Sequence, residues 1–526
     1  MRISDCVAQY ARVRPGADAV VVSGVSWSYA ELDRRVDALA SALLAAGLNK
    51  GDRVATLQTP HPEFLVVLLA TTSIGAIWVG LNPKYRLNEL SQIVVDATPK
   101  ILITRTQVGE RRYDADIRAL QIVCPSLERI VVFDGDPVLQ GAQANTEFVQ
   151  SGALVSVDTL TSARQNCGDR DPCLIVYTSG STGRPKGAVL GHEGIVEFSR
   201  TQNALWPVDP LRVLNYFPIN HVGCVIDVSL PCLWAGGCII FLEQFDPGQS
   251  LAIAAAAGVT LLASVPSVFQ MLLSLPEFQL YDLSKVQLIV FEGAPMPAEL
   301  IAQLLGIGTN LATNYGMSET TSAITALEPT RDPELLANTV GSAFPGVEVR
   351  LVAAGGHHAI AGEVGEVWAR SRYNLLEYWR APLATAQAFS ADGFFRTGDL
   401  AVQRSDGRYR LVGRVKEMFK SGGYNVYPRE VEAALESHSA VAIAAVVSVP
   451  HTMWQEVGVA FIELSAPLAT SELEDWCRER LANYKVPKRF VILPALPLLP
   501  IGKVDRIELR RLALQSEKNA EDDAVG

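Results

Sequence analysis

Short apolar runs alternate with amphipathic stretches along about the first 340 residues. The apolar runs are rich in β-branched residues, which predicts buried strands, and the stretches between them have the period of helices. The strand candidates are 53–57, 76–81, 101–104, 213–217, 238–241, 261–264 and 287–291, with helices expected at 30–46, after Pro62 and at 87–96. Alternating strands and helices with short connections predict largely parallel sheets covered by helices.

The pattern changes twice further along the chain. From about residue 341, short strands with Asp-Gly and Gly-Gly turns predict a small antiparallel barrel or meander. After Gly413 a new unit of about a hundred residues begins, with a βαβ-like order of strand and helix candidates. Residues 134–169 are less periodic and are expected to connect two sub-sheets, and the last dozen residues are expected to be disordered.

These patterns predict an α/β fold with two domains. The large N-terminal domain is residues 1–413, with α/β subdomains at about 1–169 and 170–340 and a small β-barrel-like subdomain at 341–413. The small α+β C-terminal domain is residues 414–526. A chain of 526 residues is too long for one compact core, which agrees with this division.

Charge and cysteine usage narrow the class of protein. A net charge of −11 argues against nucleic acid as a bulk electrostatic partner. The N-terminus has no signal-peptide pattern, and the apolar stretch 64–81 is broken by Thr, Ser and Gly, so we expect a cytoplasmic protein without a membrane span. The eight cysteines form no CxxC pair and predict small core residues rather than disulfides or a zinc site.

Tyr177–Gly187, with the sequence YTSGSTGRPKG, follows the apolar run 173–176 and predicts a loop at a strand exit. Glycines let backbone N–H groups approach a polyphosphate, hydroxyls add donors, and Lys186 adds a positive charge. A flexible Gly/Ser surface loop is the alternative. The segment is not a Walker loop, because Pro185 precedes the lysine and Gly187 follows it.

Three further segments end predicted strands, at the sheet edge where α/β proteins bind ligands. They are Pro218–Gly223, with His221, Glu292–Pro295, and Asn314–Glu319, whose tyrosine could stack on a base and whose carboxylate could hold Mg²⁺ through water. Taken alone, His221 is more often a capping or core residue. Together with the phosphate loop, these strand ends predict one site.

Three later segments have two interpretations each on local grounds. Asp399 in the turn Phe395–Asp399 suits a ribose diol, or simply satisfies its turn. The glycines and charges of 413–423 indicate a linker or a hinge. Lys503, on a glycine turn near the C-terminus, is by default a solvated surface lysine.

The phosphate loop, Asn314–Glu319, Arg396–Asp399, Gly413–Glu432 and Gly502–Lys503 resemble, in this order and spacing, the motifs of the adenylate-forming superfamily of acyl-CoA synthetases, luciferases and peptide-synthetase adenylation domains. The resemblance covers nearly the whole chain. It implies a large N-terminal domain of three subdomains and a small, mobile C-terminal domain. It also implies two half-reactions, in which a carboxylate and ATP give acyl-AMP and pyrophosphate, and a thiol then displaces AMP.

The resemblance assigns roles residue by residue. Catalytic roles fall on Lys503, His221 and Glu319, Mg²⁺ binding on Glu319 and Thr182, the hinge on Lys416, and coenzyme A binding on Lys420, Ser421, Gly422, Gly423 and Tyr424. The ATP and AMP contacts are Thr178, Ser179, Gly180, Ser181, Thr182, Gly183, Lys186, Gly293, Ala294, Pro295, Asn314, Tyr315, Gly316, Met317, Ser318, Asp399, Leu411, Arg414 and Lys503. Lys503 matches the lysine that bridges the acyl carboxylate and the α-phosphate, and Lys416 stands where Asp is common.

Within the superfamily, the sequence favours an acid:CoA ligase with ATP, Mg²⁺ and coenzyme A. Amino-acid adenylation domains usually carry an aspartate two residues after the Phe of their fourth core motif, whereas the corresponding segment here is Phe217–His221, without aspartate. His221 instead resembles the aromatic or histidine gate of acyl- and aryl-CoA ligases. The expected partners are a small fatty, aryl or related carboxylic acid and coenzyme A, and a homodimer stays open. A ligase that loads a carrier-protein phosphopantetheine and a non-catalytic acyl-binding protein are the alternatives.

The same resemblance places an acyl pocket at His221, Gly223, Cys224, Asp227, Gly316 and Thr321. Gly223 and Asp227 are four residues apart and share one helix face. Asp227 could recognise a polar or cationic group on the acid. Alternatively, it points to a neighbouring basic side chain or to water.

Overall fold

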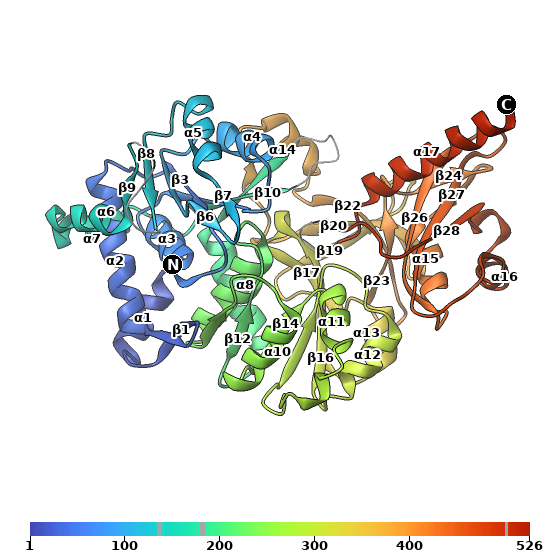
Figure 1. Ribbon diagram of the computed structural model, residues 1–526, viewed down its shortest axis with the longest axis horizontal. Coiled ribbons are helices and arrows are strands. Elements are labelled where there is room, and N and C mark those ends of the chain that lie inside the picture. Colours follow the sequence, from blue (N-terminus) through green and yellow to red (C-terminus); the bar gives the residue numbers. More distant parts are fainter. Residues whose placement is uncertain (134–138, 140, 179–184, 500–502, 526) are drawn as a thin grey trace.

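The computed structural model describes residues 1–133, 139, 141–178, 185–499 and 503–525, with side chains through residue 515. Figure 1 shows a large N-terminal part built on two sheets and a smaller C-terminal part beside it, joined near β22 and β23. This arrangement confirms the predicted α/β class with a large and a small domain.

The first sheet has eight strands in the order β21-β11-β10-β4-β3-β5-β8-β9. They are β3 (Arg53–Leu57), β4 (Ile77–Leu81), β5 (Ile101–Thr104), β8 (Arg129–Val132), β9 (Gln143–Ala144), β10 (Pro172–Thr178), β11 (Lys186–Gly191) and β21 (Glu377–Tyr378). The central strands are parallel, with Ala55 opposite Val79 and Ile175 opposite Val79. Their continuous apolar runs are buried on both faces, as parallel strands require.

The second sheet has nine strands in the order β18-β17-β16-β15-β14-β12-β13-β1-β2. They are β1 (Asp18–Val22), β2 (Val25–Ser28), β12 (Arg212–Asn215), β13 (Cys238–Phe241), β14 (Leu261–Ser264), β15 (Leu288–Phe291), β16 (Asn310–Met317), β17 (Ser322–Thr330) and β18 (Ser342–Ala343).

The two sheets exchange strands across residue 170, where the sequence suggested a subdomain boundary. β10 and β11 complete the first sheet, whereas β1 pairs with β13 in the second, with Val20 opposite Ile239. A sequential boundary at 169/170 therefore does not separate the two sheets.

Helices fill the space around the sheets. α2 (Tyr29–Ala45) begins where the Ser28 hydroxyl accepts from the Glu31 N–H, and α3 (Pro62–Ser73) is buried on every face. Residues 145–165, within the expected connection between two sub-sheets, form α6 (Asn145–Ser151) and α7 (Val157–Gln165) against α2. Gly152 makes this approach possible, because a Cβ there would lie 2.6 Å from the Ala42 backbone nitrogen.

The third sheet carries the connection to the C-terminal domain. β19 (Glu348–Val352), β20 (Val364–Arg370), β22 (Phe395–Gln403) and β23 (Tyr409–Arg414) form an antiparallel sheet in the order β19-β20-β22-β23. Of the two predicted forms, barrel or meander, the strand order is that of a meander.

The C-terminal domain packs helices on a mixed sheet. β24 (Phe419–Ser421), β25 (Tyr424–Val426), β26 (Val441–His451), β27 (Gln455–Leu464) and β28 (Arg489–Leu493) form the sheet, with α15 (Pro428–Glu436) and α16 (Thr470–Arg480). β26 and β27 are antiparallel, and the βαβ unit is β27-α16-β28. α17 (Arg506–Val525) extends as a helix into the last dozen residues, for which the sequence suggested disorder.

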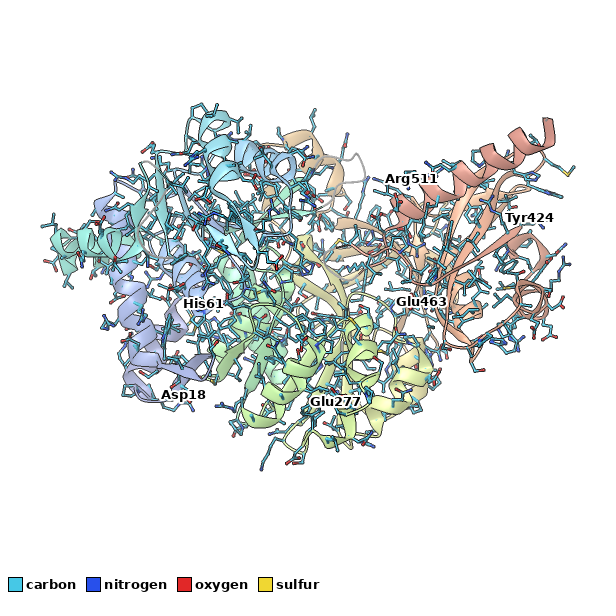
Figure 2. The ribbon with its side chains drawn as sticks, viewed as in Figure 1. Asp18, His61, Glu277, Tyr424, Glu463 and Arg511 are labelled. Atoms are coloured by element: carbon cyan, nitrogen blue, oxygen red, sulfur yellow. The ribbon has the colours of Figure 1, made fainter. Side chains whose placement is uncertain are left out.

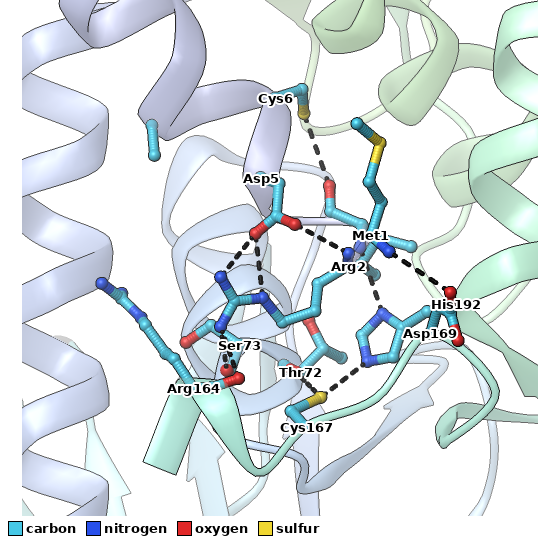
Figure 3. Close-up of polar contacts among 12 residues, drawn as sticks. Met1, Arg2, Asp5, Cys6, Thr72, Ser73, Arg164, Cys167, Asp169 and His192 are labelled. Atoms are coloured by element: carbon cyan, nitrogen blue, oxygen red, sulfur yellow. Dashed lines mark hydrogen bonds and ion pairs between the residues drawn. The ribbon is translucent and has the colours of Figure 1, made fainter. Parts of the chain in front are cut away.

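A buried polar cluster fastens the N-terminus to the large domain (Figure 3). The His192 Nδ1 accepts from the Ile3 N–H at 3.1 Å, and its Nε2 lies 3.4 Å from the Cys167 sulfur. Burial lowers the pKa of His192 to about 4 and raises the pKa of Cys167 to about 11, so the pair is neutral. All eight cysteines are buried and free. In the described residues, no helix has the length and apolar character needed to cross a membrane.

Candidate active site

The phosphate-loop candidate joins two strands of the first sheet. β10 ends at Thr178 and β11 begins at Lys186, and these two residues lie opposite each other in the antiparallel pair. The Thr178 hydroxyl donates to the Glu319 Oε1 at 3.2 Å, and the Lys186 ammonium lies 5.2 Å from the centre of the Tyr378 ring. Ser179, Gly180, Ser181, Thr182 and Gly183 lie outside the described residues.

Glu319 is held at the base of this loop by two hydroxyls. Its Oε1 accepts from Thr178 and from the Tyr378 hydroxyl, the latter at 3.0 Å. Burial, and next the Glu319 carboxylate, raises the pKa of Tyr378, so this phenol stays a donor. No group of three metal-binding side chains occurs among the described residues. Binding of Mg²⁺ does not require such a group, because Mg²⁺ commonly binds through one carboxylate, waters and substrate phosphates.

Tyr315, Asp399 and Arg414 form a second cluster, between β16, β22 and β23. The Tyr315 hydroxyl donates to the Asp399 Oδ2 at 2.8 Å, and the Arg414 Nε lies 2.9 Å from the Oδ1. Asp399 is only 6% exposed, and its charge raises the pKa of Arg414. A carboxylate has about four lone-pair sites, so Asp399 can still accept from a ribose diol.

The backbone beside this cluster is tightly constrained. A Cβ at Gly316 would lie 1.4 Å from the Ser322 carbonyl oxygen, so only glycine fits there. Thr321 and Ser322 have φ of 49° and 81°, a left-handed conformation that is uncommon outside glycine. The Thr321 hydroxyl donates to the Tyr373 carbonyl.

Lys503 reaches from the C-terminal domain to the end of β15. A Cβ built on Gly293 would lie 3.3 Å from the Lys503 Cε and 3.9 Å from its Nζ. Burial, and next Arg414, lowers the pKa of Lys503, while Glu292 and Asp399 act in the opposite direction. The lysine is positioned by a short β-bridge, in which the Leu499 N–H donates to the Lys503 carbonyl at 2.7 Å.

His221 stands at the start of η2 (Gly223–Ser229), a π-helical segment. Its Nδ1 accepts from the Gly223 N–H at 3.0 Å, which leaves the proton of the neutral ring on Nε2. Burial, and next the Lys503 charge, lowers the pKa of His221 to about 4. The ring therefore enters the site as a neutral donor. Cys224 is fully buried and accepts from the Asn215 amide, so it is a packing residue.

Asp227 and Glu292 come from two different elements and influence each other's titration. Asp227 belongs to η2, and Glu292 directly follows β15. Burial raises the pKa of Asp227 to about 6, and burial, and next the Asp227 charge, raises the pKa of Glu292 well above its usual range. Among the described residues, no ion pair with a basic side chain involves Asp227. The alternative interpretation, in which Asp227 points to a neighbouring basic side chain, therefore has no support among the described residues.

The predicted coenzyme A segment lies elsewhere. Gly422 and Gly423, with φ of 58° and 85°, form the two-residue turn between β24 and β25. Tyr424 stacks on Tyr484 with ring centres 4.6 Å apart, and Figure 2 shows Tyr424 at the side of the C-terminal domain that faces away from the large domain. Ser421 is buried in this hairpin, and Lys420 is exposed.

The other predicted residues differ in their exposure. Ala294 and Pro295 are exposed, Met317 and Leu411 are partly buried, Ser318 is buried, and Lys416 lies exposed in the connection between β23 and β24. The structure thus brings together Tyr315, Asp399 and Arg414, places Lys503 beside Gly293, and leaves Lys420–Tyr424 apart from them.

Sequence reasoning missed three contributors. Tyr378 holds Glu319, and the Thr397 hydroxyl accepts from the Asp399 N–H at 3.0 Å. Arg506, three residues after Lys503, lies 2.7 Å from the buried Glu432 and 3.7 Å from Glu417. Tyr378 and Arg506 stand in no local pattern that signals their partners, because those partners belong to other elements. Thr397, in contrast, lies two residues before Asp399 in β22.

The chain is similar to known AMP-binding enzymes over most of its length. Residues 7–379 match the family model of AMP-binding enzymes, and residues 430–503 match the model of the AMP-binding enzyme C-terminal domain. A feruloyl-CoA synthase of Amycolatopsis sp is 36% identical over 95% of this chain and 97% of its own length. An indoleacetate–CoA ligase of Aromatoleum aromaticum is 32% identical over 97% of this chain and 98% of its own.

A solved structure gives the same result. ATP-bound MatB from Rhodopseudomonas palustris is 30% identical and superimposes with a TM-score of 0.85, covering 97% of this chain and 99% of that one. The family matches span most of both domains, and the relatives align over nearly their full lengths. The chain belongs to the AMP-binding enzymes of the adenylate-forming superfamily, in the branch of acid:CoA ligases.

Proposed function

We propose that this protein is an AMP-forming acid:CoA ligase that first makes an acyl-adenylate and then transfers the acyl group to coenzyme A. The observation that supports this best is the position of Lys503 against Gly293, beside the cluster of Tyr315, Asp399 and Arg414. Lys503 of the C-terminal domain thus lies beside the cluster that is proposed to bind the nucleotide, where an acid and the α-phosphate would react.

In the first half-reaction, a carboxylate oxygen attacks the α-phosphorus and the bond to pyrophosphate breaks, without a proton transfer. Two anions must approach each other, and the buried Lys503 ammonium offsets their repulsion. Asp399 and Arg414 hold the ribose, and Lys186 with Thr178 holds the departing pyrophosphate. Glu319 would hold Mg²⁺, which supplies positive charge to the phosphates.

In the second half-reaction, the coenzyme A thiol attacks the acyl carbon and AMP leaves. We expect the C-terminal domain to rotate about Lys416, so that Lys503 leaves the site and Ser421–Tyr424 enters it. Two features support a rotation of this kind. The Ser421–Tyr424 hairpin lies away from the site in the present arrangement, and Lys416 is exposed in a short connection between the two domains.

The acid is proposed to be an aryl or related carboxylic acid. Two relatives are named for feruloyl and indoleacetate substrates, and both align over nearly the whole chain. Release of pyrophosphate should depend on such an acid, and AMP formation should be completed on addition of coenzyme A. Pyrophosphate release that needs no acid, or acids that never support it, would refute the proposed activity.

The same assay separates the second candidate, a ligase that loads a carrier-protein phosphopantetheine. Such an enzyme would form acyl-AMP but would leave free coenzyme A unacylated and would use phosphopantetheinylated carrier protein instead. Thioester formation is followed by chromatography with each thiol in turn, at equal thiol concentration.

A further inference from the structure

Lys503 belongs to a short turn that leads directly into α17. The Leu499 N–H donates to the Lys503 carbonyl at 2.7 Å, and the Asp505 N–H donates to the Pro497 carbonyl at 2.8 Å. The Asp505 Oδ1 then accepts from two N–H groups in the first turn of α17, which begins at Arg506. These bonds make the turn and the start of α17 one unit, so the position of Lys503 depends on what holds Arg506.

The Arg506 guanidinium contacts three different elements of the C-terminal part of the chain. Its Nη1 donates to the Val446 carbonyl of β26 at 2.9 Å. Its Nη2 lies 2.7 Å from the Glu432 Oε1 of α15, and its Nε lies 3.7 Å from the Glu417 Oε2, between β23 and β24. The planar guanidinium has donors in a rigid fork, so these contacts fix its orientation as well as its place.

The contact with Glu432 is buried and braced from its other side. Glu432 is fully enclosed, and its Oε1 also accepts from the Val446 N–H at 2.8 Å. The ion pair of Glu432 and Arg506 thus satisfies both backbone groups of Val446, on the edge strand of its sheet. Buried ion pairs are often no more stabilising than apolar packing. What this pair provides is one defined seat for the start of α17 on β26.

The contact with Glu417 reaches the connection between the two domains. The Glu417 N–H donates to the Arg414 carbonyl at 3.1 Å, and the Val415 N–H donates to the Gly398 carbonyl of β22 at 2.8 Å. This connection is therefore held by β22 and by the end of β23, the strands that carry the nucleotide cluster. Through Glu417, Arg506 ties the start of α17 to a segment that the large domain holds.

We propose that Arg506 is a positioning residue for adenylation, which holds the turn of Lys503 so that the Lys503 ammonium lies beside Gly293. This inference rests on the proposed acid:CoA ligase function. Arg506 acts through Lys503, because its own guanidinium is engaged by the three protein groups. A displacement of about 1 Å of a group that aligns the reactants can lower a rate about 10²-fold.

Arg506→Lys keeps the positive charge but loses the fork, since a single ammonium cannot reach all three partners. Acid-dependent pyrophosphate release, measured with ferulate and with indole-3-acetate, should fall about 10- to 100-fold. Thioester formation from supplied acyl-AMP and coenzyme A should stay within about threefold of wild type, because Lys503 has left the site in that step. Arg511→Lys changes an exposed arginine of the same helix, labelled in Figure 2, and is the matched control that should change neither step.

A double-mutant cycle separates positioning of Lys503 from general support of the domain. In the Lys503→Ala background, Arg506→Lys should change the residual pyrophosphate release by no more than about threefold, because the ammonium that it positions is already missing. A purely structural role would lower the residual rate by the same factor as in the wild-type background, and would lower both half-reactions together.

Glu417→Gln provides a second variant in case Arg506→Lys does not fold. It weakens only the contact with the connection and leaves the buried pair of Arg506 and Glu432 in place, so pyrophosphate release should fall about three- to tenfold with thioester formation unchanged. Unchanged adenylation in the variant that folds, equal losses in both half-reactions, or independent effects in the double-mutant cycle would overturn the inference. Failure of the proposed function is a different result, in which the wild-type protein releases no pyrophosphate with either acid.

Discussion

Replacement of Lys503 by alanine should remove adenylation selectively. The side chain is largely buried against Gly293, so the charge acts through a medium of effective dielectric constant near 20 rather than through water. At about 4 Å, one unit charge pair is then worth about 4 kcal/mol, against about 1 kcal/mol in water. A loss of about 4 kcal/mol corresponds to a rate about a thousandfold lower, which agrees with the loss of about 10²- to 10³-fold when one oxyanion donor is removed.

The assay measures the two half-reactions separately. Acid-dependent pyrophosphate release should fall about a thousandfold in Lys503→Ala, whereas thioester formation from supplied acyl-AMP and coenzyme A should stay within about threefold of wild type. Lys488→Ala removes an exposed lysine of the same domain and should change neither step. Equal losses in both half-reactions would refute the reasoning, because Lys503 would then support the domain rather than the meeting of two anions.

Three further changes test other parts of the structure. Tyr378→Phe removes one of the two donors to Glu319, so the Mg²⁺ concentration needed for half-maximal adenylation should rise about three- to tenfold. Glu432→Gln leaves the Arg506 guanidinium without its buried partner 2.7 Å away, and should cost about 3 kcal/mol and lower the Tm. The pKa of His192 lies near 4, below its usual 6.5, so the unfolded chain binds the additional proton and stability is lost as pH falls from 6.5 to 4. His192→Asn should therefore reduce the fall in Tm between pH 6.5 and 4.5.

For each of these three predictions, one result would contradict it. An unchanged Mg²⁺ dependence in Tyr378→Phe would show that the carboxylate is oriented by other groups. An unchanged Tm in Glu432→Gln would mean that the amide replaces the carboxylate without loss. A parallel pH dependence of Tm in wild type and His192→Asn would show that other groups, such as the partly buried His61 and His221, cause the acid sensitivity.

Local sequence was sufficient to predict most of the individual strands and helices. The runs at 53–57, 101–104 and 261–264 became strands with the same bounds, because buried parallel strands are short, apolar and bounded by turn residues. The helix of 145–151 was not expected, because its polar composition lacks a strong period. Its stability comes from packing on α2, which is a tertiary effect.

Individual site residues could be predicted where a sequence motif contains them. Contacts between residues of two different elements could not be predicted. The family motifs located Asp399, Tyr315 and Lys503, but the bond between Tyr315 and Asp399 joins residues 84 apart in sequence. The effect of Asp227 on the pKa of Glu292 likewise depends on how a π-helical segment lies against the end of β15. Neither segment carries a signal for the other, so a sequence pattern could suggest Asp227 as a pocket residue but not its partner.

The exchange of strands between the two large sheets has a consequence for how the chain folds. β1 can pair with β13 only after about 220 more residues have been synthesised, since Val20 pairs with Ile239. The first sheet, in turn, lacks β10 and β11 until residue 191 has been synthesised. A nascent chain of 200 residues would thus hold β1 with an unpaired edge that invites wrong pairing. The two sheets are expected to be completed in one cooperative event, and a fragment cut at residue 170 should fold into neither of them.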